Sequence, residues 1–291
     1  MPVVLRTLPP LVLLLVFTCL GRGVEAADPG SISGLAEGVA DWVVSIKVDR
    51  SKDIEIPRSR LPFNGRVSPE SQSYFKRPAG LVTGLLVDRR GFILTSNYNL
   101  LGTIRSVKVL LADGQERKAK IVARDPLDDL ALLRLQDGEA PVPEGKWSPP
   151  PWADASPGDS GRFVFAVGRG PSARHLNVSE GIISAVGRNT MRAVQIDAKL
   201  NYGNVGGPLV DLDGKVVGLC GFVGHTYHQW GLNSGIGFAT TVETIRKVLP
   251  QMMDGKDIKV PPRPFLGIQS ELGKGSNAGA PVVEVVKDSS A

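Results

Sequence analysis

The sequence predicts an all-β protein of barrel or sandwich architecture with one helix near its C-terminal end. Short apolar runs rich in β-branched residues recur along most of the chain, a spacing typical of such folds. The dipeptides that begin at Asp113 and Asp213 are Asp-Gly, a strong hairpin signal. Finally, a Pro-rich stretch at residues 137–158 divides the runs into two sets.

Each apolar run predicts one strand. The first set consists of residues 42–48, 81–87, 92–95, 107–111, 118–122 and 130–135. The second set consists of residues 162–167, 181–186, 193–196, 209–211 and 215–219. Two strand-rich halves of similar length therefore predict two packed β-units rather than a single sheet.

A capping box and a helical apolar stripe predict the one helix. Thr240 and Glu243 have the spacing of a capping box. The stripe consists of Val242, Ile245 and Leu249. Pro250 follows the stripe, and we expect it to end the helix because proline cannot continue the hydrogen-bond ladder.

The first 26 residues have the three parts of a secretory signal peptide. Arg6 supplies a positive charge, residues 11–20 are almost entirely apolar, and Ala26 ends a small-residue cleavage site. The apolar run is shorter than the roughly 20 residues of a membrane span. We therefore expect an exported protein, periplasmic or extracellular, without an integral span after cleavage; an uncleaved anchor is the alternative.

Composition excludes several classes of protein. The 34 Lys and Arg against 29 Asp and Glu give a net charge of +5 over 291 residues, and no run of five like charges occurs, so a dedicated nucleic-acid surface is not expected. Two cysteines and three histidines leave little material for a metal cluster or a disulfide framework, so we expect no metal and no cofactor. The predicted division is residues 1–26 signal peptide, 27–136 first β-unit, 137–158 linker, 159–250 second β-unit with the helix, 251–262 linker and 263–291 a separate segment.

Residues 201–210, Asn-Tyr-Gly-Asn-Val-Gly-Gly-Pro-Leu-Val, closely resemble the nucleophile segment of the HtrA-like (Deg) serine proteases. That family carries Asn-Pro-Gly-Asn-Ser-Gly-Gly-Pro-Leu there. Four further segments match the family in the right order, at residues 91–98, 125–133, 180–184 and 236–239. The resemblance spans residues 36–268 and implies a trypsin-like double β-barrel.

The resemblance also implies that the catalytic triad positions are Tyr98, Asp129 and Val205. Only the aspartate has the family's residue type. Valine has no heteroatom to attack a carbonyl, and a phenol with a pKa near 10 is a poor base at neutral pH. No histidine precedes His175, so the first β-unit has no imidazole to offer from a shifted position.

Two binding elements are implied to survive the loss of the triad. The backbone of Gly203, Asn204, Val205 and Gly206 is expected to form the turn that aims amide groups at a substrate carbonyl. The family segment at Ile236, Gly237, Phe238 and Ala239 is expected to contribute to peptide binding by strand addition.

Three local patterns suggest other chemistry. Ser160 lies in a Gly-Asp-Ser-Gly sequence, but Arg162 and Phe163 follow where a nucleophile motif has glycine and proline. Cys220 lies in an apolar run, with His225 and His228 close behind, so a thiol–imidazole pair is conceivable. A core cysteine and a polar loop are the plainer interpretations of these residues.

The C-terminal segment resembles the beginning of a PDZ domain. Residues 263–268, Arg-Pro-Phe-Leu-Gly-Ile, resemble the carboxylate-binding loop, and residues 280–286 resemble the following strand. The 29 residues from Arg263 are fewer than a complete domain of that type needs. We therefore expect an incomplete PDZ-like segment.

These observations lead to a pseudoprotease hypothesis: an exported, catalytically inactive HtrA-like protein that binds polypeptide segments or HtrA-like subunits. The resemblance also implies possible self-association, with residues 31–42 in the corresponding position. One alternative is a serine-type endopeptidase that uses Ser160 or Cys220 as an unorthodox nucleophile. Another is a purely structural protein, in which the barrels serve only as rigid bodies.

Overall fold

The computed structural model describes residues 34–35, 38–52, 80–136, 148–153, 160–170, 175–221, 235–259, 268–270 and 282–285. The predicted signal peptide, His225 and His228 lie outside these residues. Within them, no helix is long and apolar enough to cross a membrane.

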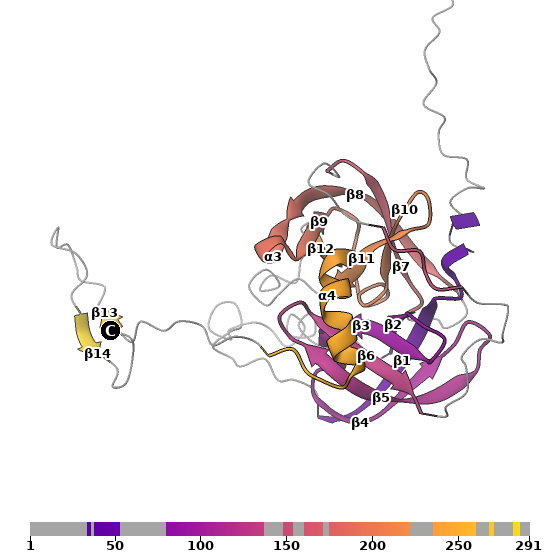
Figure 1. The fold of residues 1–291 in the computed structure, drawn as a ribbon, viewed down its shortest axis with the longest axis horizontal. Helices are drawn as coiled ribbons and strands as arrows, with labels where there is room; N and C mark the ends of the chain where they lie inside the picture. Colours follow the sequence, from indigo (N-terminus) through magenta and orange to yellow (C-terminus); the bar gives the residue numbers. More distant parts are fainter. Residues whose placement is uncertain are drawn as a thin grey trace, which may run out of the picture.

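Two closed six-stranded antiparallel barrels confirm the predicted all-β class (Figure 1). The strands of the first barrel are β1 Val43–Lys52, β2 Leu81–Leu86, β3 Phe92–Ser96, β4 Thr103–Leu110, β5 Glu116–Asp125 and β6 Leu130–Leu135, in the order β1-β2-β3-β6-β5-β4. The strands of the second are β7 Phe163–Gly168, β8 Asn177–Gly187, β9 Ala193–Ile196, β10 Pro208–Asp211, β11 Val216–Gly221 and β12 Gly237–Thr241, in the order β10-β11-β12-β9-β8-β7. Closure pairs both edges of each sheet, which removes the exposed edges that promote aggregation.

Three apolar clusters hold the described chain together. One fills the first barrel, around Ile46 and Leu133, and another fills the second, around Val194 and Leu209. The third joins the two barrels, because Leu94 of the first and Phe165 of the second belong to the same buried cluster. The barrels thus share a core along the contact that carries the candidate site.

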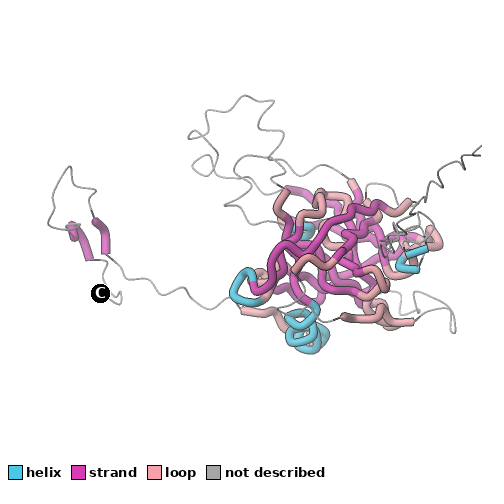
Figure 2. Tube along the Cα trace, turned by 90° about the horizontal axis from the view of Figure 1, so that it is seen from above, coloured by secondary structure: helices cyan, strands magenta, loops and turns pink. Residues whose placement is uncertain are grey.

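Short helices lie at the ends of strands (Figure 2). The 3-10 helix η3 Asn97–Leu100 follows β3, and α3 Arg188–Met191 separates β8 from β9. The longer α4 Val242–Met253 follows β12 and packs against β11 and β12 of the second barrel and β5 of the first. Ile245 and Met252, both fully buried, anchor α4 in the cluster shared by the barrels.

The structure corrects both predicted ends of α4. Its N-cap is Thr241, whose hydroxyl accepts from the amide of Thr244; Thr240 instead lies in β12. Pro250 lies inside the helix, where it removes one hydrogen bond of the last turn without ending it. The chain turns at Gly255, which has a φ of +80° and donates to the carbonyl of Met252, as helix-terminating glycines do.

The described part of the predicted linker docks on both barrels. The indole of Trp42 donates to the carbonyl of Ser148 at 2.9 Å, and Trp152 forms a parallel bridge with Val216. Farther along, β13 Ile268–Ser270 pairs with β14 Val282–Val285, within the segment that was predicted to be PDZ-like.

Candidate active-site cleft

The turn at residues 201–207, here called the nucleophile loop, connects β9 with β10. Asn201 and Asn204 lock its shape: the side chain of Asn201 accepts from the amide of Gly203 at 2.6 Å, and that of Asn204 accepts from the amide of Asn201 at 2.8 Å. The Asn204 amide group also donates to the carbonyl of Lys199. Such Asx bonds explain why this sequence forms a tight turn and does not continue β9.

Glycine allows the nucleophile loop to lie against other backbone. Gly206 has a φ of +90°, and a Cβ atom there would lie 2.4 Å from the carbonyl oxygen of Thr83 in β2. A Cβ atom on Gly207 would lie 2.0 Å from the carbonyl oxygen of Val167 in β7. Only glycine fits at these two positions, because the loop packs directly against the backbone of β2 in the first barrel and of β7 in the second.

All four amides of the predicted oxyanion turn donate to acceptors inside the protein. The amide of Gly203 donates to the Asn201 side chain, and those of Asn204 and Val205 donate to the Asn201 carbonyl at 3.1 and 3.0 Å. The amide of Gly206 donates to the carbonyl of Cys220 at 2.7 Å. In this conformation the turn is present, but a substrate carbonyl would have to displace these bonds before it could be held there.

Val205 places an isopropyl group where the family resemblance puts the nucleophile. Its side chain is buried, with 4% of its surface exposed. Its carbonyl accepts from the side-chain amide of Asn99 at 2.9 Å, which ties the nucleophile loop to η3 of the first barrel. Asn99 also donates to the hydroxyl of Thr95, so the tie is part of a buried network.

The position implied for the base lies on η3 and carries Tyr98. Ser96 caps this helix and accepts from the Tyr98 amide at 3.2 Å. Asp129, with a φ of +54°, accepts from the same amide at 2.9 Å and from the Ser96 hydroxyl at 2.5 Å. The family aspartate therefore holds the backbone of the turn.

An aromatic pair spans the cleft at the implied catalytic centre. The rings of Tyr98 from the first barrel and Tyr202 from the nucleophile loop are stacked, with centroids 6.4 Å apart and planes at 28°. Both side chains are half-buried. The structure brings Tyr98, Asp129 and Val205 to one region, as the resemblance implies, with a phenol and an isopropyl group at the positions implied for the base and the nucleophile.

Ser160, the first alternative nucleophile, lies away from the nucleophile loop. Ser160 is exposed and lies just before the first residue of β7. Gly168, at the other end of β7, contacts the nucleophile loop. Asn177 lies opposite Gly168 in the β7–β8 ladder, so His175 lies near the end of the hairpin that is distant from Ser160. Ser160 thus has no adjacent imidazole among the described residues.

Cys220 lies inside the second barrel. It is fully buried, and burial raises the pKa of its thiol to about 12. The thiolate is the nucleophilic form of cysteine, so this side chain stays protonated and unreactive at neutral pH.

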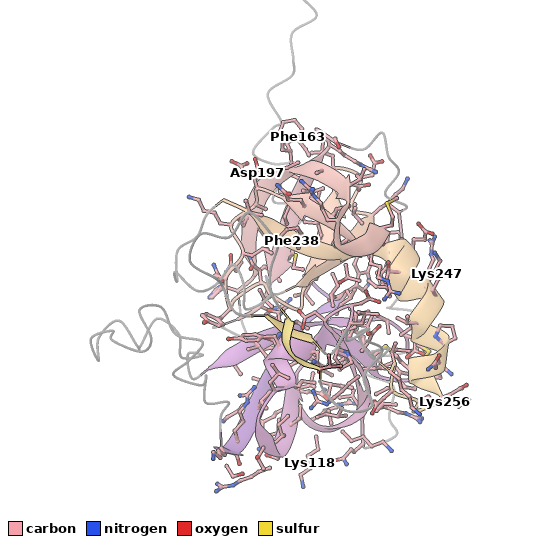
Figure 3. All side chains as sticks on the ribbon, turned by 90° about the vertical axis from the view of Figure 1, so that its left-hand side faces the viewer. Lys118, Phe163, Asp197, Phe238, Lys247 and Lys256 are labelled. Atoms are coloured by element: carbon pink, nitrogen blue, oxygen red, sulfur yellow. The ribbon has the colours of Figure 1, made fainter. Side chains whose placement is uncertain are left out.

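Strand β12 is paired on both edges. Phe238 lies opposite Gly221 of β11 on one side and Gln195 of β9 on the other. The expected strand addition at residues 236–239 therefore has no free backbone edge to use. Only the side chains of Ile236, 43% exposed, and Phe238, half-buried, reach the surface from this segment (Figure 3).

The contact between the barrels contains charged residues that no sequence motif pointed to. Buried Arg169 of the second barrel donates to the carbonyls of Val43 and Ala40, and burial lowers its pKa. Arg192 contacts both carboxylate oxygens of buried Asp128, at 3.3 and 3.2 Å. These arginines fix the barrels against each other on either side of the cleft.

A second carboxyl group lies beside Asp128. Asp125 is fully buried, and burial together with the neighbouring Asp128 raises its pKa to about 6. One oxygen of Asp125 accepts from the amides of Leu127 and Asp128. Among the described residues, no group of three or more His, Cys, Asp or Glu is arranged to hold a metal ion.

Comparison with known proteins agrees with this geometry. Residues 82–219 match the model of the trypsin-like peptidase domain. The chain is 29% identical to the periplasmic serine endoprotease DegP of Escherichia coli K12, in an alignment that covers 90% of this chain and 60% of DegP. It is 30% identical to the periplasmic pH-dependent serine endoprotease DegQ of the same organism, over 86% of this chain and 53% of DegQ. With the serine endoprotease DegS of Haemophilus influenzae it shares 31% identity, over 72% of this chain and 60% of DegS. The chain thus spans about 60% or less of the length of these relatives.

Proposed function

Because the chain carries a trypsin-like peptidase domain and is homologous to the HtrA (Deg) serine endoproteases, we propose that it is an exported pseudoprotease whose former active-site cleft binds polypeptide segments. The homology supports a Deg-like function at the level of the family. The finer statement, binding without hydrolysis, is our proposal.

One observation carries this proposal: Tyr98 and Val205 occupy the positions that the family resemblance assigns to the base and the nucleophile, and the nucleophile loop next to them still forms a tight turn. Hydrolysis of a peptide needs a proton acceptor with a suitable pKa next to an attacking group. Tyr98 and Val205 supply neither. The glycines and asparagines of the nucleophile loop still build its tight turn.

A bound peptide would contact side chains more than strand edges. The two tyrosine rings offer apolar surface with polar tips, and the side chains of Ile236 and Phe238 offer further apolar surface. Aromatic side chains bury a large area at small entropic cost, which suits them to peptide binding. Gly221 lies at the end of β11, and a Cβ atom there would be 3.5 Å from the Asp129 carboxylate, so an extended peptide that continued from this strand end would begin beside the implied catalytic centre.

The test combines hydrolysis with binding. We expect the purified chain to release no fragments from unfolded casein and to resist labelling by a fluorophosphonate, while binding fluorescent casein saturably. Turnover comparable with that of DegP would refute the proposal, and labelling mapped to Ser160 would instead support the unorthodox enzyme. Absence of saturable binding would favour a purely structural protein.

A second observation favours self-association. Phe163 and Leu212 are 58% and 56% exposed, and Phe163 lies opposite Ile182 in the β7–β8 ladder. The β7–β10 register places Leu212 beside Phe163, so the three side chains form one apolar row on the outside of the second barrel. We propose a second copy of this chain as the partner, since symmetric homo-oligomers are the commonest assemblies. Sedimentation should show that Phe163→Ser lowers the oligomeric mass, and an unchanged mass would remove this candidate.

A further inference from the structure

The outer face of the first barrel carries lysines in register on three neighbouring strands. Lys47 of β1 lies opposite Lys108 of β4, and Lys108 lies opposite Lys118 of β5. Residues directly opposite in antiparallel strands point to the same face, with Cβ atoms about 5 Å apart. The three ammonium groups therefore share one patch, at the end of the molecule where Lys118 is labelled in Figure 3.

A second pair of cations extends this patch. Lys120 lies two residues beyond Lys118 on the same face of β5 and opposite Arg134 of β6. We call the five side chains the lysine face: Lys47, Lys108, Lys118, Lys120 and Arg134.

Few negative charges offset the lysine face. Glu116 pairs with Lys108 at 2.5 Å, and its pKa is lowered by that hydrogen bond and by the charges of Lys108 and Lys47. Asp49 lies two residues from Lys47 on the same strand. On the described strands β1, β4, β5 and β6, Asp49 and Glu116 are the exposed carboxylates beside these five cations, although the whole chain is close to balanced, with 34 cations and 29 carboxylates.

The arrangement opposes folding. Like charges directly opposite on neighbouring strands destabilise a sheet, and here the repulsion occurs twice in one row. In the second barrel, by contrast, the corresponding outward pair Phe163 and Ile182 is uncharged. A locally unfavourable pattern of this kind points to a function outside the fold.

We propose that the lysine face is a docking surface for a bilayer that contains anionic phospholipids. Four of its five cations are lysines, whose flexible and strongly hydrated point charges suit an array of mobile headgroups better than one bidentate partner. The large side chains that are exposed on the described residues, such as Phe163 and Met191, lie outside β1, β4, β5 and β6. The lysine face therefore lacks exposed aromatic rings on which single-stranded nucleic acid could stack.

The position of the lysine face separates docking from the cleft. The implied catalytic centre lies where the barrels meet, whereas the lysine face consists of side chains of β1, β4, β5 and β6 of the first barrel. A membrane-bound molecule would keep the candidate peptide site accessible. This inference is independent of the proposed function, because it requires no occupied cleft.

The experiment measures binding of the full chain to phosphatidylcholine vesicles with and without phosphatidylglycerol, by sedimentation at low and high salt. The test variant is Lys47→Gln/Lys118→Gln/Lys120→Gln, which leaves the Lys108–Glu116 ion pair in place. The matched control is Lys199→Gln/Lys215→Gln/Lys247→Gln, which removes the same charge from exposed positions on the second barrel and α4.

We expect the parent and the control to bind only the anionic vesicles and to dissociate at high salt. The test variant should bind roughly 10- to 100-fold more weakly, given the contribution of each basic residue near an anionic surface. Circular dichroism must show that all three proteins are folded. If the control lost affinity equally, net charge and not the lysine face would determine binding, and the proposal would be wrong. Absence of binding by the parent would also overturn it. If the chain bound polyglutamate more tightly than the vesicles, the partner of the lysine face would be an acidic polypeptide and not a bilayer.

Discussion

The nucleophile loop and the η3 turn are the two walls of the candidate site: they meet where the barrels are in contact, and they hold their shapes by different means. The loop is fixed by steric fit, since Gly206 and Gly207 lie where any Cβ atom would collide with backbone of β2 or β7. The η3 turn is fixed by hydrogen bonds, since Asp129 and Ser96 both accept from the amide of Tyr98. In both walls, the residues that hold the backbone differ from those that would perform the chemistry.

This difference explains how the backbone of this site can hold its shape with Tyr98 and Val205 at the positions implied for the base and the nucleophile. Val205 is buried and packs in a turn whose path its neighbours determine. Asp129 keeps a structural role because its carboxylate caps the turn whether or not an imidazole follows. Substitution at the implied catalytic positions therefore need not alter the fold, and variants of the nucleophile loop and of the η3 turn test this separately.

The largest effect is expected at the nucleophile loop. Gly207→Ala would place a methyl group 2.0 Å from the carbonyl oxygen of Val167, so the loop or β7 must move. We expect the free energy of unfolding to fall by more than about 3 kcal/mol, as for other substitutions that overpack a core or strain backbone. Urea unfolding followed by tryptophan fluorescence measures this change.

Gly38→Ala is the control, because a Cβ atom at Gly38 meets nothing within 4 Å. Its effect should stay within about 0.5 kcal/mol, as for surface substitutions. Equal stability of the Gly207 variant and the parent would show that the loop is not sterically fixed.

A pH-dependent effect is expected where the barrels meet behind the η3 turn. The pKa of Asp125 is raised to about 6 by burial and by Asp128, and Arg192 is the cation that faces Asp128 from the second barrel. The folded state therefore binds this proton more tightly than the unfolded state does. The free energy of unfolding should then fall as the pH rises from about 4 to 6, with a contribution of about 2 kcal/mol.

Asp125→Asn tests this sign. Its side-chain oxygen still accepts from the amides of Leu127 and Asp128, but it carries no titrating proton. The variant should match the parent at low pH and exceed its stability above pH 6, measured by urea unfolding across the range. Asp254→Asn, at an exposed carboxylate, should leave the difference from the parent independent of pH. If the stability of the parent relative to Asp125→Asn instead increased with pH, the raised pKa of Asp125 would be contradicted.

A smaller effect is expected from the tyrosine pair that joins the two walls. Stacked aromatic pairs contribute about 1 kcal/mol beyond the area they bury. In a double-mutant cycle of Tyr98→Ala and Tyr202→Ala, we expect a coupling energy of about 1 kcal/mol in unfolding. A coupling energy near zero would mean that the rings pack independently and that the aromatic surface of the cleft is not a unit.

Most of the fold could be predicted from the sequence, because eleven of the twelve barrel strands have their own local signal; β12 Gly237–Thr241 is the strand that was missed. Leu130–Leu135 matches β6 residue for residue, and the Asp-Gly turns lie where expected. The helix ends could not be placed, because Thr240 and Thr241 offer alternative caps and the contact of Thr240 with Asp128 decides between them. The prediction that Pro250 ends the helix was wrong for a similar reason, because Met252, two residues beyond it, is buried in the core.

The candidate site could be located but not described in full. Motif order brings Tyr98, Asp129 and Val205 to one cleft, yet it says nothing of Arg169 or of the Asp128–Arg192 pair, whose partners are distant in sequence. The pairing of β12 on both edges is a property of barrel closure, which no local pattern reveals. Likewise the lysine face depends on register, since its lysines are spread from Lys47 to Lys120.

The smallest expected effect is a partial return of catalysis, and it tests whether both walls of the cleft are truly preserved. Val205→Ser alone should stay inactive, because the position implied for the base carries a phenol and not an imidazole. Tyr98→His alone lacks a nucleophile. The double variant should place an imidazole between Asp129 and the introduced hydroxyl, and slow labelling by a fluorophosphonate should return only there, since triad members act as a unit.

The rate should be low, for two structural reasons. Ser96 already donates to Asp129 at 2.5 Å and would compete with the imidazole, and the amides of Gly203 and Val205 are bonded within the loop. A misplacement of about 1 Å can cost roughly 100-fold in rate. Comparing the parent, both single variants and the double by mass mapping of the label gives the result. A folded double variant that stays unlabelled would mean that the loop cannot release its amides, and the peptide-holding cleft would lose its main support.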